Sequence, residues 1–223
     1  GHSSSRLVLK RNSINANRRR AQVEIEIRDL TTAEKALAGA VAGRALSDNP
    51  TFRWIAGDDN IARVGGAMDL FAGFVAGHLD PQVGAFLGDH VVGVCGSAAP
   101  GMCIGDVAPE ELRTPPETIG APGDGSREHF VWSLLCTKDL DERHWHLGPV
   151  SVEPLLQGEG IGAKMLTIFC QRMDNAGEIV WLETDKPDNV IFYSRHGFVV
   201  AEEVVAPTSG EQFTTWFMRR DPR

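Results

Sequence analysis

The chain has 223 residues, of which 42% are hydrophobic, so its length suits one large domain with ample apolar material for a packed core. A formal net charge of −8 argues against general nucleic-acid binding, and no apolar run reaches the roughly 20 residues needed to cross a bilayer. The four cysteines show no C-x-x-C spacing and are too few for a disulfide scaffold, which favours reduced thiols in a cytoplasmic protein.

Charge is unevenly distributed along the chain. Residues 1–20 hold six basic residues and no acidic one, so the remainder has 16 basic against 30 acidic side chains. The polar, aperiodic composition of residues 1–20 predicts a disordered basic tail that opens with a vector-derived Gly-His-Ser run. We expect residues 21–223 to form a single domain, whose acidic character suits a cationic or amine substrate.

Hydrophobic periodicity predicts both helices and strands in the first half of the chain. Thr31 and Glu34 have the spacing of a capping box, which opens a helix with Leu37 on its apolar stripe. A second helix starts near Asn60, and Gly88-Asp89 predicts a tight hairpin. The predicted elements are a strand at 22–28, helices at 31–47 and 60–79, and strands at 83–87 and 90–97.

The second half begins with a stretch that has no pattern. Residues 99–125 are rich in proline and glycine, which predicts a long surface loop with room for a short helical turn. Gly148-Pro149 interrupts a later strand, where we expect a bulge or splay because proline removes a ladder donor. The predicted elements are helices at 128–140, 161–177 and 187–195, and strands at 145–152, 179–183, 198–205 and 213–218.

A glycine-rich run at 158–162 separates the strand at 145–152 from a strongly amphipathic helix. Glycine lets the backbone approach a ligand, and the first N–H groups of a helix lack intrahelical partners, so this arrangement suits an anion such as pyrophosphate. Three interpretations compete: a flexible connection, a dinucleotide fingerprint of the form G-x-G-x-x-A, and an acyl-CoA site. The dinucleotide interpretation is disfavoured, because residues 153–157 intervene after the strand and too little chain follows for a dinucleotide domain.

Three ordered motifs make the acyl-CoA interpretation specific. The run Gln157-Gly158-Glu159-Gly160-Ile161-Gly162 resembles the Q/R-x-x-G-x-G/A signature of the GCN5-related N-acetyltransferase (GNAT) family. Residues 147–154 are similar to that family's splayed fourth strand. Residues 189–198, which begin with Asn189 and contain Phe192-Tyr193 followed by x-x-x-Gly197-Phe198, resemble a later segment of the family. The extended loop before the fourth strand is similar to that of puromycin N-acetyltransferase and its relatives. The resemblance implies an α/β GNAT fold: a mixed, mostly antiparallel sheet, splayed at its fourth strand, with helices on both faces.

The resemblance also implies how acetyl-CoA, the co-substrate, would be held. Backbone N–H groups along 157–162 would bind the pyrophosphate at the start of the helix. Val150 and Val152 would pair with the pantetheine arm as though it were another strand, and the N–H of Val152 would donate to the thioester carbonyl. The implied cofactor-binding residues are Val150, Val152, Gln157, Gly158, Glu159, Gly160, Ile161, Gly162, Ala163 and Asn189.

Acetyl transfer to an amine needs a proton acceptor and an acid for the leaving thiolate. Tyr193, the only tyrosine in the chain, matches the family's general-acid position, with plain ring packing as the alternative. Glu183 and His146 are rival candidates for the base, and an ordinary strand-end carboxylate and a satisfied histidine are their structural alternatives. His144 and His146 form an H-x-H pair that could suggest a metal, but no third ligand is evident nearby, so no metal site is predicted.

These motifs lead us to expect an N-acetyltransferase that moves an acetyl group from acetyl-CoA directly to a primary amine of a small molecule. The alternatives are a protein or peptide N-acetyltransferase and a non-catalytic acyl-CoA sensor on the same fold. The resemblance places acceptor selection in the first two helices and in the loops at 99–125 and 206–212, and Phe52-Arg53-Trp54 near Asp58-Asp59 would suit an amphiphilic amine. We expect a cytoplasmic monomer or homodimer with no nucleic-acid or membrane partner.

Overall fold

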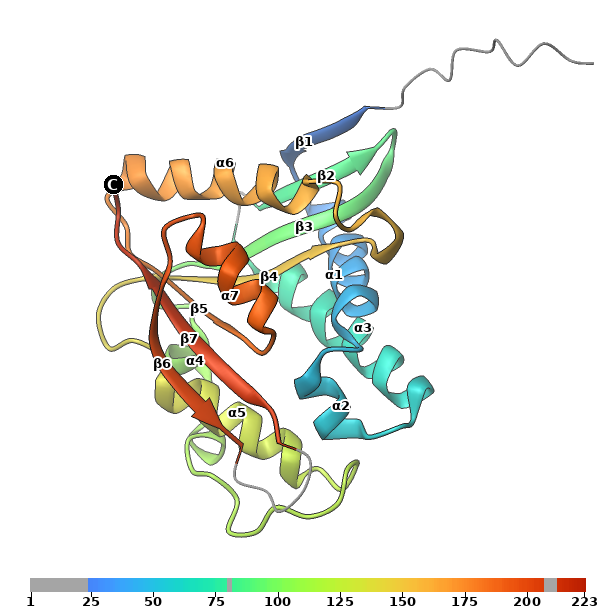
Figure 1. Cartoon of the computed structure of the whole chain (residues 1–223), viewed down its shortest axis with the longest axis vertical. Helices are drawn as coiled ribbons and strands as arrows, with labels where there is room; N and C mark the ends of the chain where they lie inside the picture. The colour runs from blue at the N-terminus through green and yellow to red at the C-terminus, as the bar shows by residue number, and fades with distance from the viewer. Residues whose placement is uncertain (1–23, 80–81, 207–211) are drawn as a thin grey trace, which may run out of the picture.

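A mixed sheet of seven strands runs through the part of the chain that the computed structural model describes, residues 24–79, 82–206 and 212–223 (Figure 1). The strand order is β1-β2-β3-β4-β5-β7-β6, and β4 with β5 is the parallel pair among antiparallel neighbours. The predicted mixed, mostly antiparallel sheet is therefore confirmed. The strands are β1 (Ile25–Asp29), β2 (Val83–Leu87), β3 (His90–Ala98), β4 (Trp145–Val152), β5 (Val180–Thr184), β6 (Val199–Val205) and β7 (Thr214–Arg220).

The helices follow the predicted order, with one addition. The predicted tail at 1–20 and most of the 206–212 loop lie outside the described residues. The helices are α1 (Thr32–Leu46), α2 (Pro50–Ala56), α3 (Asn60–Gly77), α4 (Ile104–Val107), α5 (Ser126–Lys138), α6 (Ile161–Ala176) and α7 (Pro187–Ser194), with single 3₁₀ turns at Glu110–Leu112 and Pro154–Leu156. Helix α2 was not predicted, although Asn49 at its N-cap and Pro50 at its first position are typical helix-start residues. None of the described helices has the length and apolarity needed to cross a membrane.

The two faces of the sheet are covered by different helices, as alternate residues of each strand show. On β7, Met218 belongs to a buried cluster with Met165 of α6, whereas its neighbour Phe217 packs with Leu134 of α5. Successive side chains of a strand point to opposite faces, so α6 and α5 lie on opposite sides of the sheet. Helices α1 and α3 pack with Phe86 and Val94 in a further cluster. The predicted placement of helices on both faces is confirmed.

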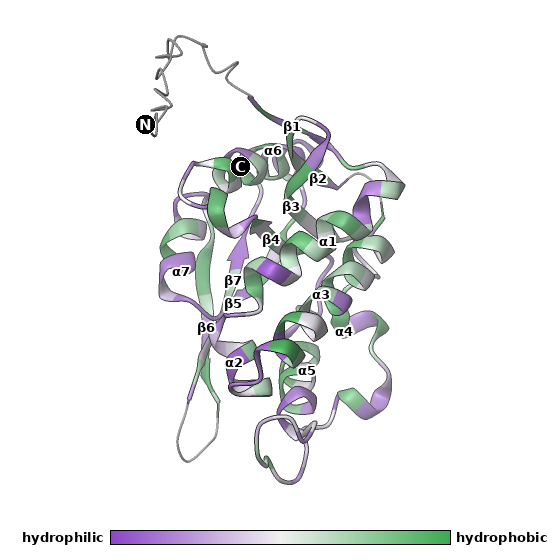
Figure 2. Cartoon of the chain, turned by 90° about the vertical axis from the view of Figure 1, so that its right-hand side faces the viewer, coloured by the Kyte–Doolittle hydropathy of each residue, from purple (hydrophilic) through white to green (hydrophobic). Residues whose placement is uncertain are grey.

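Helices α1 and α3 lie side by side in both views of the molecule (Figures 1 and 2). The capping box of Thr31 and Glu34 is present, as predicted. The predicted apolar stripe is wrong at Leu37, which is 60% exposed. The buried face instead contains Gly39 and Gly43, where an added Cβ would overlap the backbone of α3. Close approach of the two helix backbones, rather than burial of large side chains, decides this interface.

Strand β4 has the irregularity that Gly148-Pro149 predicts. Against β3, Cys95 faces Val150 and Ser97 faces Leu147, so one residue of β3 opposes Gly148 and Pro149 together, and the peptide bond between these two is cis. Against β5, β4 pairs at only two positions, Trp145 with Val180 and His146 with Trp181. Beyond His146 the two strands separate, which confirms the predicted splay and opens the space in which the site lies.

Candidate active site

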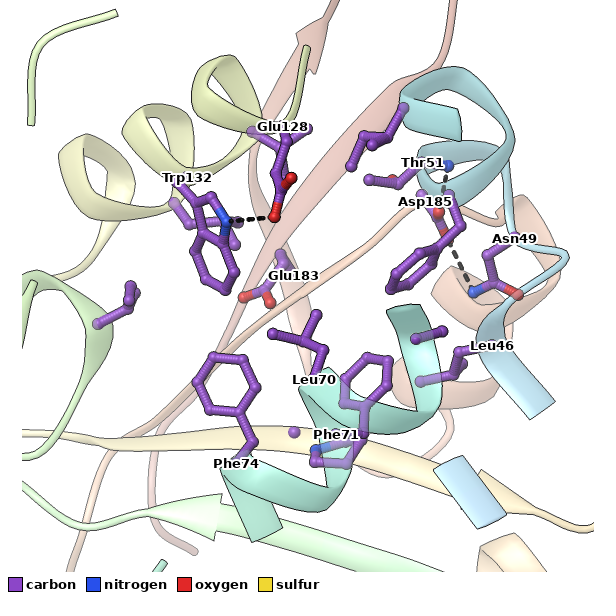
Figure 3. A pocket seen from close by; sticks show the side chains of 18 of the residues that line it. Leu46, Asn49, Thr51, Leu70, Phe71, Phe74, Glu128, Trp132, Glu183 and Asp185 are labelled. Carbon is purple, nitrogen blue, oxygen red and sulfur yellow. Dashed lines mark hydrogen bonds between the residues drawn. The ribbon is translucent and has the colours of Figure 1, made fainter. Parts of the chain in front are cut away.

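A cavity of about 940 Å³ is lined by residues of β4 and β5 and by helices α2, α3, α5 and α7. Figure 3 shows Phe71 and Phe74 of α3 and Trp132 of α5 arranged around Glu183. The rings form a continuous aromatic wall, since the Phe74 centroid lies 5.7 Å from that of Trp132 and 6.5 Å from that of Phe71. The cavity therefore offers an apolar enclosure with a carboxylate at its base.

Glu183 and His146 meet at the base of this cavity. His146 belongs to β4 and Glu183 to β5, and His146 Nε2 lies 2.6 Å from Glu183 Oε2. The Glu183 side chain is 29% exposed and that of His146 is 12% exposed, so the carboxylate is the more accessible partner. The two residues that the sequence offered as rival bases thus form one hydrogen-bonded pair.

Behind His146 lies a second carboxylate, that of Asp139. His146 Nδ1 is 3.2 Å and His144 Nε2 is 2.9 Å from the same Asp139 oxygen, while the Gly105 N–H donates to the other oxygen at 2.8 Å. Burial opposes ionisation of Asp139, but these donors outweigh it and hold its pKa well below the usual range. Burial also disfavours the charged form of His144, yet its hydrogen bond to Asp139 raises its pKa to about 10.

Tyr193 of α7 also lines the cavity. Its side chain is buried, and its ring packs edge-on against Phe192 and Phe198 at centroid distances of 5.2 and 5.6 Å. Burial raises the pKa of the Tyr193 phenol well above its ordinary value, so the hydroxyl keeps its proton at neutral pH. Asn189 lines the same region and donates from Nδ2 to Thr184 Oγ1 at 3.0 Å.

The glycine run precedes α6 at the surface of the molecule. Gly158 and Gly160 adopt φ values of +85° and +77°, in the left-handed region, and an added Cβ at either would meet no atom within 4 Å. Gly160 is the N-cap of α6 without a side-chain cap, so the first N–H groups of this 16-residue helix are left for an external acceptor. The run therefore fits the pyrophosphate of an acyl-CoA.

The remaining predicted cofactor residues are divided between the cavity and its surroundings. Val150 and Asn189 line the cavity, whereas Val152 belongs to the hydrophobic core and Gln157 donates from Nε2 to the Val152 carbonyl at 3.1 Å. Residues 157–163 are not among the lining residues. The glycine run before α6 and the cavity are thus two separate regions with β4 between them, an arrangement that suits an elongated ligand.

Four of the five residues expected to select the acceptor, all except Phe52, are not among the lining residues. Phe52 lines the cavity, but Trp54 is buried against Phe130 and Phe213, and Asp59 caps α3. Arg53 forms an ion pair with Asp48. The aromatic wall comes instead from α3 and α5, which the sequence indicated as helices without showing which of their faces line a cavity.

His78 and Glu128 are cavity residues that sequence reasoning missed. Burial lowers the pKa of His78 to about 4, so its imidazole is neutral at physiological pH. Glu128 stands at the exposed rim, with Oε1 3.5 Å from Trp132 Nε1 (Figure 3). Neither residue belongs to a motif, so no sequence signal distinguishes them from neighbouring positions on the same helices.

Negative charge predominates around the cavity. Among the described residues, four carboxylates line it, and the lining arginine, Arg63, is engaged by Asp48 and the Gly57 carbonyl. Asp185 accepts from the Thr51 N–H and Asn49 Nδ2, which ties it to the start of α2 (Figure 3). The lining carboxylates are Asp69, Glu128, Glu183 and Asp185. A cationic group is therefore favoured over an anionic one in this cavity.

The model of the Acetyltransferase (GNAT) family matches residues 41–198. The chain belongs to this family. That match spans the splayed β4, the glycine run before α6 and all three residues at the base of the cavity, Glu183, His146 and Tyr193. The activity of this GNAT protein is therefore acetyl transfer, whereas the finer resemblance to puromycin N-acetyltransferase stays a prediction.

Solved structures of other GNAT proteins share the fold. A histone acetyltransferase HPA2-related acetyltransferase from Corynebacterium glutamicum is similar at a TM-score of 0.60 and 19% identity, covering 89% of this chain and 97% of its own. A mosquito arylalkylamine N-acetyltransferase-like protein reaches a TM-score of 0.62 at 16% identity, with 89% and 100% coverage. A Drosophila melanogaster polyamine N-acetyltransferase gives 0.60 at 12% identity, also with 89% and 100% coverage. At these identities the likeness shows the fold alone.

Proposed function

We propose that this GNAT acetyltransferase transfers an acetyl group from acetyl-CoA directly to the primary amine of a small amphiphilic molecule. The observation behind the proposal is the cavity itself, which joins Val150 and Tyr193 on the cofactor side to Glu183 and an aromatic wall on the other. An enclosed apolar space with a carboxylate at its base suits an ammonium group attached to an apolar body.

The proposed binding path for acetyl-CoA runs from the start of α6 along β4 to the cavity. Backbone N–H groups at the start of α6 would hold the pyrophosphate, since Gly158 and Gly160 leave the backbone open to it. Where β4 leaves β5, the edge of β4 from Leu147 to Val152 that no longer pairs with β5 would pair with the pantetheine arm. Acetyl-CoA supplies the activated thioester, and these contacts aim it at the cavity.

Glu183 is the proposed proton acceptor. The N–H of His146 at 2.6 Å donates to one carboxylate oxygen and orients the group, which leaves the other oxygen to receive a proton from the substrate ammonium. The neutral amine can then form its bond to the acetyl carbon. This arrangement assigns His146 to positioning and Glu183 to proton transfer.

Tyr193 is the proposed general acid. As the bond between the acetyl carbon and sulfur breaks, the thiolate of CoA needs a proton, and the phenol of Tyr193 is still protonated at neutral pH because of its burial. The phenol faces the same cavity as Glu183, so one residue receives a proton while the other donates one. The nitrogen of the adduct also loses its second ammonium proton, which replaces the proton that the Tyr193 phenol gave to the thiolate, and the proton held by Glu183 is released to solvent.

The character of the wall supports a narrower substrate class. Phe71, Phe74 and Trp132 would pack against an aromatic or aliphatic body, and the positive charge would lie near Glu183. A polyamine would place its further positive charges against these rings, although Glu128 at the rim would offer it a second anion. We therefore favour an arylalkylamine or a similar single amine as the acceptor.

A comparison of acceptors tests this function. The purified chain is incubated with acetyl-CoA and, in turn, 2-phenylethylamine, spermidine, an aminonucleoside or a lysine peptide, and the release of free CoA is measured together with the product mass. We expect the highest kcat/KM with 2-phenylethylamine. A preference for the peptide would support a protein-modifying enzyme, and acetyl-CoA binding without release by any amine would support a sensor.

A further inference from the structure

A buried group of four potential metal ligands lies behind the cavity. Cys103, Asp139, His144 and His146 each offer one ligand atom, and these atoms all lie within 4.8 Å of one another. Cys103 is fully buried, and the side chains of Asp139, His144 and His146 are 4%, 3% and 12% exposed. The sequence showed the two histidines without a third ligand, and the fold supplies a third and a fourth.

We propose that these four residues bind a zinc ion. Each imidazole has an oxygen acceptor at its outer nitrogen, because His144 Nδ1 is 2.8 Å from the Glu142 carbonyl and His146 Nε2 is 2.6 Å from Glu183 Oε2. A neutral imidazole has a single N–H, so donating it outward leaves a lone pair at the inner nitrogen. Metal-bound histidines in proteins have this arrangement, with the distal N–H held by a carbonyl or a carboxylate.

A cation between its members would satisfy the inner side of the group. The inner nitrogens of His144 and His146 lie 2.9 and 3.2 Å from one oxygen of Asp139, and a lone pair facing a carboxylate oxygen is repulsive. Without a metal, both buried rings would have to be imidazolium ions to satisfy these contacts. One zinc ion satisfies them with neutral rings, and it uses the thiolate of Cys103 as well.

The distances and the ligand types fit zinc. Tetrahedral zinc with bonds of 2.0 to 2.3 Å separates its ligand atoms by about 3.3 to 3.8 Å, so the Asp139 contacts need to widen by only a few tenths of an ångström. Cys103 Sγ makes weak contacts to the carbonyls of Ala99 at 3.7 Å and His144 at 3.9 Å. One thiolate, two imidazoles and one carboxylate favour zinc over magnesium or calcium, which prefer oxygen ligands.

Such an ion would join three separate parts of the chain. Cys103 precedes α4 and Asp139 follows α5. His144 directly precedes β4, and His146 belongs to it. With all four positions taken by protein atoms, the site would be structural, without an open position for a reacting group. It would hold α5, and with it Trp132, against the splayed strand. This proposal rests on the ligand cluster and stands or falls independently of acetyl transfer.

Metal analysis of the full chain, purified without a metal-affinity resin and equilibrated with zinc, tests the site. We expect about one zinc ion per chain and an X-ray absorption spectrum with one sulfur at about 2.3 Å and three nitrogen or oxygen atoms near 2.0 Å. Replacing zinc with cobalt should produce the near-ultraviolet charge-transfer band of a thiolate-bound ion. Wild-type protein that retains no stoichiometric metal, or a zinc shell without sulfur, would overturn the proposal.

Matched cysteine variants locate the ion. Cys103→Ser should abolish the cobalt charge-transfer band, whereas Cys136→Ser should leave it unchanged, since Cys136 is another buried thiol outside the cluster. Asp139→Asn should lower zinc affinity while its near-isosteric side chain preserves packing. A band that survives Cys103→Ser, or that disappears equally in Cys136→Ser, would place the metal elsewhere and overturn the assignment. If a variant fails to fold, the X-ray absorption spectrum of the wild-type protein still tests whether sulfur is bound to the zinc ion.

Discussion

Replacing Glu183 with glutamine removes proton acceptance while preserving the shape of the cavity. The two side chains are nearly isosteric, and the amide oxygen can still accept the N–H of His146, which lies 2.6 Å from Glu183 Oε2. The two proteins therefore differ in the negative charge of this group and in its ability to bind a proton, and not in the shape of the cavity. A general base contributes about 10²- to 10⁴-fold, so kcat/KM at pH 7 should fall by that factor, equivalent to about 3 to 5 kcal/mol.

The assay is kcat/KM for 2-phenylethylamine across a range of pH. An alkylamine has a pKa near 10, close to that of a lysine side chain, so the free amine becomes abundant as the pH approaches this value. We expect the gap between wild type and Glu183→Gln to narrow there, because a free amine needs no base. Glu128→Gln is the matched control, since it removes a second cavity carboxylate at the rim and should raise KM without this convergence.

Two outcomes would refute this reasoning. A loss below about threefold at pH 7 would show that Glu183 is not the base, since a general base supplies at least about 10²-fold. A large loss that stays constant up to pH 10 would show a binding or packing role instead. Either outcome would make His78 the next candidate, because it lines the same cavity and its pKa of about 4 keeps it neutral.

Three further changes test other parts of the molecule. Tyr193→Phe should lower kcat by at least about tenfold with unchanged acetyl-CoA affinity in equilibrium binding, and unchanged turnover would contradict the general-acid assignment. Trp132→Ala should raise KM for 2-phenylethylamine by about tenfold or more and have a smaller effect on propylamine; equal effects on the two amines would argue against the aromatic wall as a selector. Burial lowers the pKa of His78 to about 4 from 6.5, so the unfolded chain binds more protons between these values. The resulting stability is complete above pH 6.5, and up to about 3 kcal/mol of it is lost as the pH falls to 4. His78→Gln should flatten this part of the denaturant-unfolding profile, and parallel profiles would contradict the linkage.

Local patterns predicted most elements of the fold. Strand β4 has the predicted bounds, and α6 begins at the predicted residue, because strong periodicity there is bounded by glycine and proline. Helix α2 was not predicted, since seven residues are too few to establish a helical period. The apolar stripe of α1 was wrong at Leu37 because hydrophobicity does not reveal that Gly39 and Gly43 permit close helix contact.

The sequence predicted those parts of the candidate site whose residues belong to contiguous motifs. Tyr193 and the glycine run before α6 belong to contiguous motifs, and the structure places the first in the cavity and the second in a conformation suited to an anion. Their roles remain to be tested by the experiments above. Phe74 and Trp132 are ordinary helix residues in the sequence, and they become a wall only because α3 and α5 pack at the same opening.

The sequence by itself determined the order of most elements, the break in β4 and the family motifs, since each depends on residues close together in the chain. It also presented Glu183 and His146 as rivals, and His144 and His146 as a pair without further ligands. Tertiary structure decided otherwise: β4 and β5 bring Glu183 to within 2.6 Å of His146, and the end of α5 brings Asp139 to both histidines. Contacts between distant segments depend on packing of the whole sheet and its helices, which local periodicity does not specify.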